Sequence, residues 1–269
     1  MNAEANGVTP VLEVRDLSIR FGGVHALQSV NLRAMPEAIV GLIGPNGAGK
    51  TTLFNCISGF YKPEEGSILF HGKDIGRLPP HRRALVGIGR TFQNVGLCKS
   101  ETVFDNLIIA QHYAARYSPL AGMFGIGVAK VERDLAQRAN EILELVGLTS
   151  HRNHQIHELS AGLMRIAELA CILSADPSFL LLDEPAAGLS PEATDRMREV
   201  LVRVRQERRL TILMIGHVMR LVMGVADHVY VLNFGELLAE GTPAEIQGNA
   251  QVVEAYMGRE AEAPIPSRR

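Results

Sequence analysis

The feature that most constrains this chain is the segment GPNGAGKT at residues 44–51, which fits the pattern G-x-x-x-x-G-K-[ST]. Its glycines let successive backbone N–H groups curl around phosphates, and the N-terminus of a following helix adds positive potential. In this pattern the lysine reaches the β and γ phosphates, and the Thr hydroxyl is offered to Mg²⁺. The expected nucleotide-binding residues are Gly44, Pro45, Asn46, Gly47, Ala48, Gly49, Lys50, Thr51 and Thr52.

The sequence on both sides of this loop decides whether the match is meaningful, because short motifs also occur by chance. The run AIVGLI at residues 38–43 is uninterruptedly apolar, as in a strand that is covered on both faces. A helical stretch follows at residues 50–58 and is stopped by Gly59. A strand before the loop and a helix after it form the context that phosphate binding requires, and they disfavour the alternative of a glycine turn without a ligand.

The rest of the chain alternates between strand and helix patterns. The N-terminal part reads as strands, with a shift of the alternation at Asp16, and the region 103–173 is mostly helical. Further elements are expected at 12–19 and 27–32 (strands), 61–75 (a turn, a strand and a second turn), 131–146 (helix), 179–183 (strand), 191–208 (helix), 211–215 (strand) and 228–241 (a strand pair turning at 233–235). This order predicts an α/β fold with a parallel sheet and an antiparallel addition at the N-terminal end.

Length and composition exclude several classes of protein. The 269 residues predict one domain at 11–258, with a flexible lead at 1–10 and a flexible tail at 259–269. With 27 Lys and Arg against 29 Asp and Glu, no basic field exists to hold nucleic acid. The basic run at 203–209 is therefore interpreted as a solvated helix face. No apolar stretch approaches the about 20 residues of a membrane-spanning helix, and three scattered cysteines favour a reducing cytoplasm over a disulfide framework.

Two further groups of polar residues follow apolar strands. Asp183 and Glu184 end the run FLLLDE, where carboxylates beside a buried strand need partners. Alone, a solvated strand end is the favoured interpretation. Together with the loop at 44–51, Asp183 is expected to hold Mg²⁺, and Glu184 to orient or deprotonate a water molecule. His217 follows the strand at 211–215, and ligands gather at the carboxyl edge of a parallel sheet.

The ordered set of motifs resembles the ATP-binding subunits of ABC transporters over residues 11–258. The set consists of Phe21, GPNGAGKT, Gln93 in RTFQN, LSAG at 159–162, FLLLDEP, GLSP at 188–191 and His217. The resemblance implies a P-loop NTPase fold with a RecA-like parallel-sheet core, an N-terminal antiparallel β subdomain and a helical subdomain at about 95–170. Its cofactors would be ATP and Mg²⁺.

The resemblance also implies roles for individual residues. Phe21 would stack on adenine, and Gln93 would contact Mg²⁺ and the attacking water. Ser160 and Gly162 would offer donors to the γ-phosphate held by an opposite subunit, while His217 would contact the γ-phosphate of its own subunit. The nucleotide would therefore lie between two ATPase subunits, and the second could be a copy or a paralogue.

The implied assembly adds two transmembrane permease subunits and, indirectly, a periplasmic or extracellular solute-binding protein. This chain would then be peripheral, at the cytoplasmic face of the membrane. The segments RTFQN, LLLDEPAAGLSP and VVEAYMG are similar to the ATPases of branched-chain amino acid importers, and residues 110–130 look like the longer of their two ATPase types. Import of urea or another solute, lipopolysaccharide export and a non-transport ABC ATPase remain alternatives. Residues 119–129 fit either a buried helical hairpin or a contact with a membrane subunit.

The signature segment departs from the family pattern, which is usually LSGGQ. Here it reads LSAGL, so Ala161 adds a methyl group close to a phosphate and Leu163 replaces a glutamine. Cys171 stands where an arginine is common, and Gly216 and Val218 flank His217 in place of acidic residues. We hypothesise that the composite site using this signature hydrolyses ATP more slowly than its counterpart.

Overall fold

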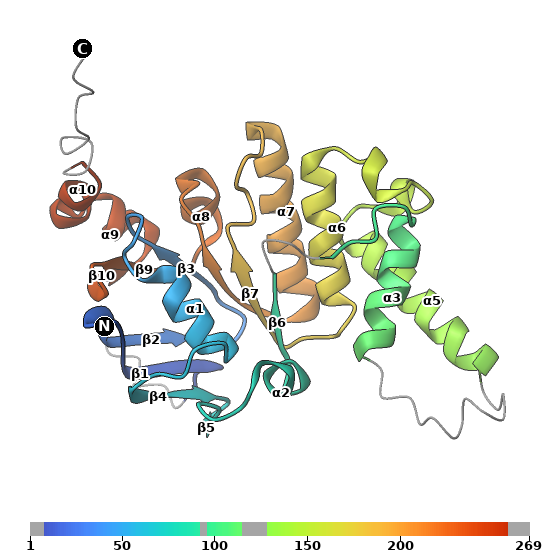
Figure 1. Ribbon diagram of the computed structural model, residues 1–269. Helices are drawn as coiled ribbons and strands as arrows, with labels where there is room; N and C mark the ends of the chain where they lie inside the picture. The colour runs from blue at the N-terminus through green and yellow to red at the C-terminus, as the bar shows by residue number, and fades with distance from the viewer. Residues whose placement is uncertain (1–7, 92–95, 115–127, 258–269) are drawn as a thin grey trace, which may run out of the picture.

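The computed structural model describes residues 8–91, 96–114 and 128–257. Its main sheet has six strands in the order β10-β9-β3-β8-β7-β6 (Figure 1). These strands are β3 (Ile39–Ile43), β6 (Ile88–Arg90), β7 (Phe179–Asp183), β8 (Thr211–Ile215), β9 (His228–Asn233) and β10 (Glu236–Gly241). Strands β3, β6, β7, β8 and β9 are parallel, and only β10 is antiparallel to its neighbour β9. The predicted parallel α/β core is confirmed.

A second, antiparallel sheet has the order β2-β1-β4-β5. Its strands are β1 (Leu12–Phe21), β2 (Val24–Ala34), β4 (Glu65–Phe70) and β5 (Lys73–Asp74). The predicted shift at Asp16 is confirmed, because this residue has a φ of 46° and the pairing with β2 changes register between Val14 and Leu17. The two-residue strand β5 lies where the sequence predicts a turn.

The helices cover both faces of the main sheet. They are α1 (Lys50–Ser58), α2 (Pro80–Leu85), α3 (Val103–Ala114), α5 (Val128–Leu145), α6 (Ala161–Leu173), α7 (Pro191–Arg208), α8 (Met219–Val225), α9 (Pro243–Gln247) and α10 (Ala250–Met257). Helices α1 and α7 have the predicted bounds, and Gly59 ends α1 in the left-handed conformation, with a φ of 83°. Helix α5 begins three residues before the predicted 131.

The alternation of side chains along each parallel strand divides the interior into two apolar cores. On β3, Ile39 and Ile43 join a core that also includes residues of α5, α6, α7 and α8. Val40 and Leu42 point to the other face, where they meet α1 and the antiparallel sheet. Successive side chains of a strand point to opposite faces, so a strand buried on both sides serves two cores. Helix α1 is thereby held between the two sheets.

Three features noted in the composition can be located in the described part of the chain. All three cysteines are free, and no helix there has the length and apolar character to cross a membrane. In the basic run, Arg205 pairs with Asp227 at 2.8 Å, and Arg203 donates to the Leu145 carbonyl at 3.3 Å. Arg203, Arg208 and Arg209 are exposed, so the run is a solvated helix face as predicted.

Candidate functional site

Two glycines of the P-loop, residues 44–51, are required by close backbone packing. Gly44 has a φ of 149°, and a Cβ atom there would lie 2.1 Å from the Leu232 carbonyl oxygen. Gly49 has a φ of 101°, and its Cβ would lie 2.6 Å from the carbonyl oxygen of Ala26. Gly49 is also the N-cap of α1 and provides no side-chain cap. The first N–H groups of α1 therefore have no side-chain acceptor at the N-cap, which suits an anion at this helix end.

Lys50 is folded over this loop. Its side chain is buried at 9% exposure, and Nζ donates to the carbonyl oxygens of Gly44 at 2.7 Å and Pro45 at 2.8 Å. The next residue, Thr51, is exposed on the first turn of α1, and Thr52 is half-buried. The ammonium group is thus already positioned at the loop, where it can form a charge-assisted hydrogen bond with a phosphate.

Asp183 ends β7 with a side chain that is only 7% exposed. Its backbone N–H donates to Thr91 Oγ1 at 2.8 Å, and its Oδ2 lies 3.5 Å from Nη2 of Arg90. Burial raises the pKa of Asp183, and the charge of Glu184 raises it further, whereas Arg90 and Lys50 lower it. The carboxylate is thus held in a dry position and relies on nearby cations to keep its charge.

Glu184 and His217 meet at the carboxyl edge of the sheet. Glu184 has a φ of 51°, and its N–H donates to the carbonyl oxygen of Ile215, the last residue of β8, at 3.0 Å. This turn brings Glu184 Oε1 to 3.2 Å from Nδ1 of His217, with the two side chains 34% and 58% exposed. A carboxylate that is partly open to solvent and lies beside an imidazole can position a water molecule or accept its proton.

A magnesium ion fits these residues if a nucleotide supplies the other ligands. Among the described residues, no group of three or more His, Cys, Asp or Glu side chains forms a metal site. Mg²⁺ is commonly held by one or two protein oxygens together with phosphates and waters. The buried carboxylate of Asp183 and the exposed hydroxyl of Thr51 are oxygen ligands of that kind.

Phe21 lies at the end of β1 and is exposed, as a base-stacking residue must be. Its ring meets that of Tyr61 edge to face, with the centroids 5.2 Å apart and the planes at 64°. The Tyr61 N–H donates to the Asn55 carbonyl oxygen of α1 at 3.1 Å. The ring predicted to stack on adenine is therefore connected to the helix that begins at the P-loop.

The signature segment, residues 159–162, begins α6. Ser160 is exposed and caps the helix, since its Oγ accepts from the Leu163 N–H at 3.4 Å. Ala161 is exposed, whereas Gly162 is buried, and a Cβ on Gly162 would lie 2.8 Å from that of Ala193 on α7. Gly162 is thus also required for the packing of α6 against α7. The predicted residue Gln93 lies outside the described residues.

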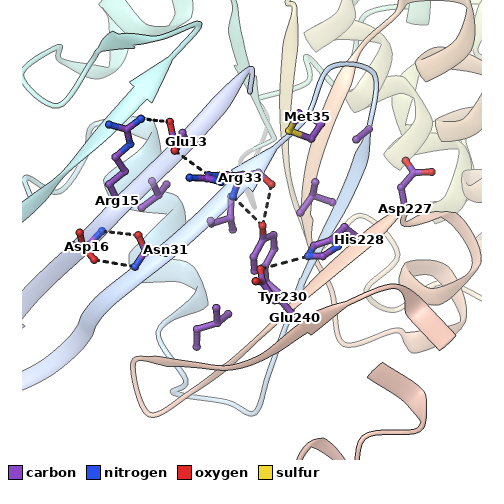
Figure 2. Close-up of a pocket in the computed structure, with 15 residues that line it drawn as sticks. Glu13, Arg15, Asp16, Asn31, Arg33, Met35, Asp227, His228, Tyr230 and Glu240 are labelled. Atoms are coloured by element: carbon purple, nitrogen blue, oxygen red, sulfur yellow. Dashed lines mark hydrogen bonds and ion pairs between the residues drawn. The ribbon is translucent and has the colours of Figure 1, made fainter. Parts of the chain in front are cut away.

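A groove of about 790 Å³ lies away from these residues (Figure 2). It is lined by the first half of β3 and β9, opposite to the P-loop end of β3, and by β1, β2 and β10. Several of its charged side chains pair with one another: Glu13 binds Arg15 at 2.8 Å and Arg33 at 3.0 Å, and His228 lies 3.5 Å from Glu240. None of the residues predicted for the nucleotide site lines it.

Sequence reasoning missed one residue of the site, Arg90. The segment RTFQN was noted for Gln93, but Arg90 ends β6 beside Asp183 and is nearly buried. The available signal was a charged residue at the end of a short apolar strand, where the buried Asp183 needs a cation.

A phosphate-binding loop between a parallel strand and a helix, with acidic residues at the end of another parallel strand of the same sheet, defines a P-loop NTPase. A family profile described as ABC transporter matches residues 27–187. A second, described as branched-chain amino acid ATP-binding cassette transporter, matches residues 236–262.

Relatives and solved structures agree with these profiles. The chain is 44% identical to the high-affinity branched-chain amino acid transport ATP-binding protein BraF of Pseudomonas aeruginosa, over 93% of this chain and 98% of BraF. It is equally identical, with the same coverage, to LivG of Escherichia coli. The crystal structure of an ATP-binding cassette of an ABC transporter in its ADP conformation has a TM-score of 0.82 and 31% identity, over 93% of this chain and 99% of that one. The chain belongs to the ABC transporter family, as an ATP-binding subunit with an ATP-hydrolysing domain.

Proposed function

We propose that this chain hydrolyses Mg²⁺-bound ATP to energise an importer of branched-chain or related amino acids. The observation that carries the catalytic part is the convergence of Lys50, Asp183 and Glu184 at one edge of the parallel sheet. The amino acid specificity is supported by the profile match at residues 236–262 and by the relatives BraF and LivG. Identity to the lipopolysaccharide export protein LptB of Haemophilus influenzae is lower, at 31%.

In the proposed reaction, the P-loop N–H groups and Lys50 bind the phosphates. Thr51 and Asp183, with Gln93, would hold Mg²⁺, which when bound neutralises phosphate charge. Glu184 orients the attacking water or accepts a proton from it. His217 lies beside Glu184, helps to hold it in place and contacts the γ-phosphate. Phe21 stacks on the adenine ring.

The proposed catalytic unit contains two such chains, or this chain and a paralogue. Ser160 and Gly162 would contact the nucleotide of the opposite subunit, and the exposure of Ser160 is consistent with that role. ATP binding would draw the subunits together and hydrolysis would release them. The cycle would move two permease subunits at the cytoplasmic face of the membrane, with a solute-binding protein delivering the solute outside.

Reconstitution tests this function directly. The chain would be co-purified with its permease pair, placed in proteoliposomes with the solute-binding protein, and supplied with ATP. We expect uptake of leucine, isoleucine or valine that depends on ATP and is lost with Lys50→Ala. Uptake of urea alone, or no uptake of any amino acid by an assembly that hydrolyses ATP, would contradict the proposed solute.

A further inference from the structure

Arg90 connects three elements of the nucleotide site from a nearly buried position. It is the last residue of β6, and its side chain is 11% exposed. Its Nη1 donates to Asn55 Oδ1 at 2.9 Å and to Ser58 Oγ at 2.8 Å, both on α1, while Nη2 lies 3.5 Å from Oδ2 of Asp183. A buried guanidinium is costly unless acceptors surround it, and here the acceptors come from α1 and β7.

The two contacts on α1 lie on a particular face of that helix. Thr51, Asn55 and Ser58 are spaced as i, i+4 and i+7, so their side chains project from the same side. Arg90 therefore forms its hydrogen bonds on the same face of α1 as Thr51, which lies one turn closer to the P-loop than Asn55. With its other nitrogen it faces the carboxylate of Asp183.

The surroundings of Arg90 limit its motion. The guanidinium carbon lies 5.5 Å from the centre of the Phe60 ring and 6.0 Å from that of Phe54. The adjacent Thr91 accepts the N–H of Asp183 at 2.8 Å, and its own N–H donates to the Leu181 carbonyl oxygen at 2.9 Å. The end of β6 thus fixes both the backbone and the side chain at the end of β7.

We propose that Arg90 is a positioning residue that sets the Thr51 hydroxyl and the Asp183 carboxylate in register to receive Mg²⁺. The inference rests on the proposed magnesium role of these two residues. It separates two events, since the phosphates bind to the P-loop and Lys50, whereas the metal needs both α1 and β7 in place. Lysine cannot replace Arg90, because one ammonium lacks the fork that spans two acceptor groups.

The test measures equilibrium binding of a fluorescent ATP analogue to the purified chain, first in EDTA and then over a Mg²⁺ titration. For Arg90→Met we expect nucleotide affinity in EDTA to stay within about twofold of wild type, because Lys50 and the P-loop are intact. The Mg²⁺ concentration for the half-maximal change should rise at least about tenfold, as for loss of other residues that orient a metal ligand. Arg90→Lys should shift it in the same direction.

Two matched variants accompany this test. Arg205→Met removes an arginine that pairs with Asp227 at 2.8 Å, outside the site, and should leave both measurements unchanged. The double change Asn55→Ala and Ser58→Ala frees α1 while Arg90 still faces Asp183, so it should give a smaller shift in Mg²⁺ dependence. This variant decides the question if substitutions of Arg90 do not fold, as judged by thermal denaturation.

The outcomes are distinguishable. If the nucleotide affinity of the wild-type chain does not change with Mg²⁺ concentration, the proposed magnesium site itself is wrong. A Mg²⁺-dependent wild type with an unchanged Arg90→Met variant would overturn only the role of Arg90. An equal loss of affinity in EDTA and in Mg²⁺ would show that Arg90 merely supports the fold, and would also overturn the inference.

Discussion

The P-loop half of the site, represented by Lys50 and Asp183, and the signature segment at residues 159–162 differ in how far they are buried. Lys50 and Asp183 are 9% and 7% exposed. Lys50 is hydrogen-bonded to the carbonyl oxygen of Gly44, and the backbone N–H of Asp183 to Thr91. Ser160 and Ala161 are exposed, and the start of α6 rests on a cap bond of 3.4 Å and on the close approach of Gly162 to Ala193. Lys50 and Asp183 are enclosed by their own chain, while Ser160 and Ala161 lie at the surface.

This difference follows from what each half must do. Buried charged groups need their partners before the ligand arrives, since an unpaired charge in a dry environment is costly. A group that serves the nucleotide of another subunit must instead remain accessible until that subunit docks. Changes in the P-loop half should therefore alter ATP binding by an isolated chain, whereas changes in the signature segment should alter hydrolysis only in the assembled ATPase.

The largest expected effect comes from Lys50→Ala, which should abolish measurable ATP binding by an isolated chain. The variant removes the ammonium that Gly44 and Pro45 hold at the loop. Titration with a fluorescent nucleotide measures it, and Lys73→Ala, on the exposed strand β5, serves as the control. An unchanged affinity in Lys50→Ala would refute the phosphate role.

Glu184→Gln should lower ATP hydrolysis by about a hundredfold or more, because the amide cannot accept a proton from water. ATP affinity should be retained, since the side chain of Glu184 lies against His217, at 3.2 Å, and the phosphates bind to the P-loop and Lys50. Phosphate release measures the rate, with Glu240→Gln as the control at the groove in Figure 2. Hydrolysis at the wild-type rate would exclude Glu184 as the base.

Ser160→Ala should lower hydrolysis by the assembled ATPase by about tenfold, the effect of one hydrogen bond to a charged group. The isolated chain should bind ATP as wild type does. Loss of the cap should also cost about 1 kcal/mol of unfolding free energy. Thr242→Ala is the matched control, because Thr242 Oγ1 accepts from the Glu245 N–H at 3.4 Å and caps α9. A decrease in hydrolysis shared by both variants would point to stability alone.

The smallest effect is expected from Ala161→Gly, which removes the extra methyl group of the signature segment. Hydrolysis by the assembly should rise by about twofold, provided that the lost helix propensity, up to about 1 kcal/mol, leaves α6 folded.

With a paralogous partner, Glu184→Gln in this chain should remove more activity than the equivalent change in the partner. Equal effects of the two changes would contradict a slow composite site at this signature.

Much of the fold could be predicted because its signals are local. The apolar run before the P-loop and the stop at Gly59 predict β3 and α1, and alternation with a shift at Asp16 predicts β1. The two-residue strand β5 was missed because its pairing with β4 depends on a neighbouring strand and not on its own pattern. Arg90 was missed for a related reason, since its acceptors Asn55 and Asp183 are remote from it in sequence.

The sequence by itself determined the chemistry of the site: a glycine loop with a lysine, two carboxylates after an apolar strand, and a histidine after the next. These motifs can be recognised in the sequence because each consists of a few neighbouring residues. Only the tertiary structure decided which groups meet, namely Glu184 with His217, and Asp183 with Arg90. It also gave Gly162 a packing role against Ala193. Such contacts arise when parallel strands and helices far apart in the chain align at one edge of the sheet, a result of long-range packing rather than of local pattern.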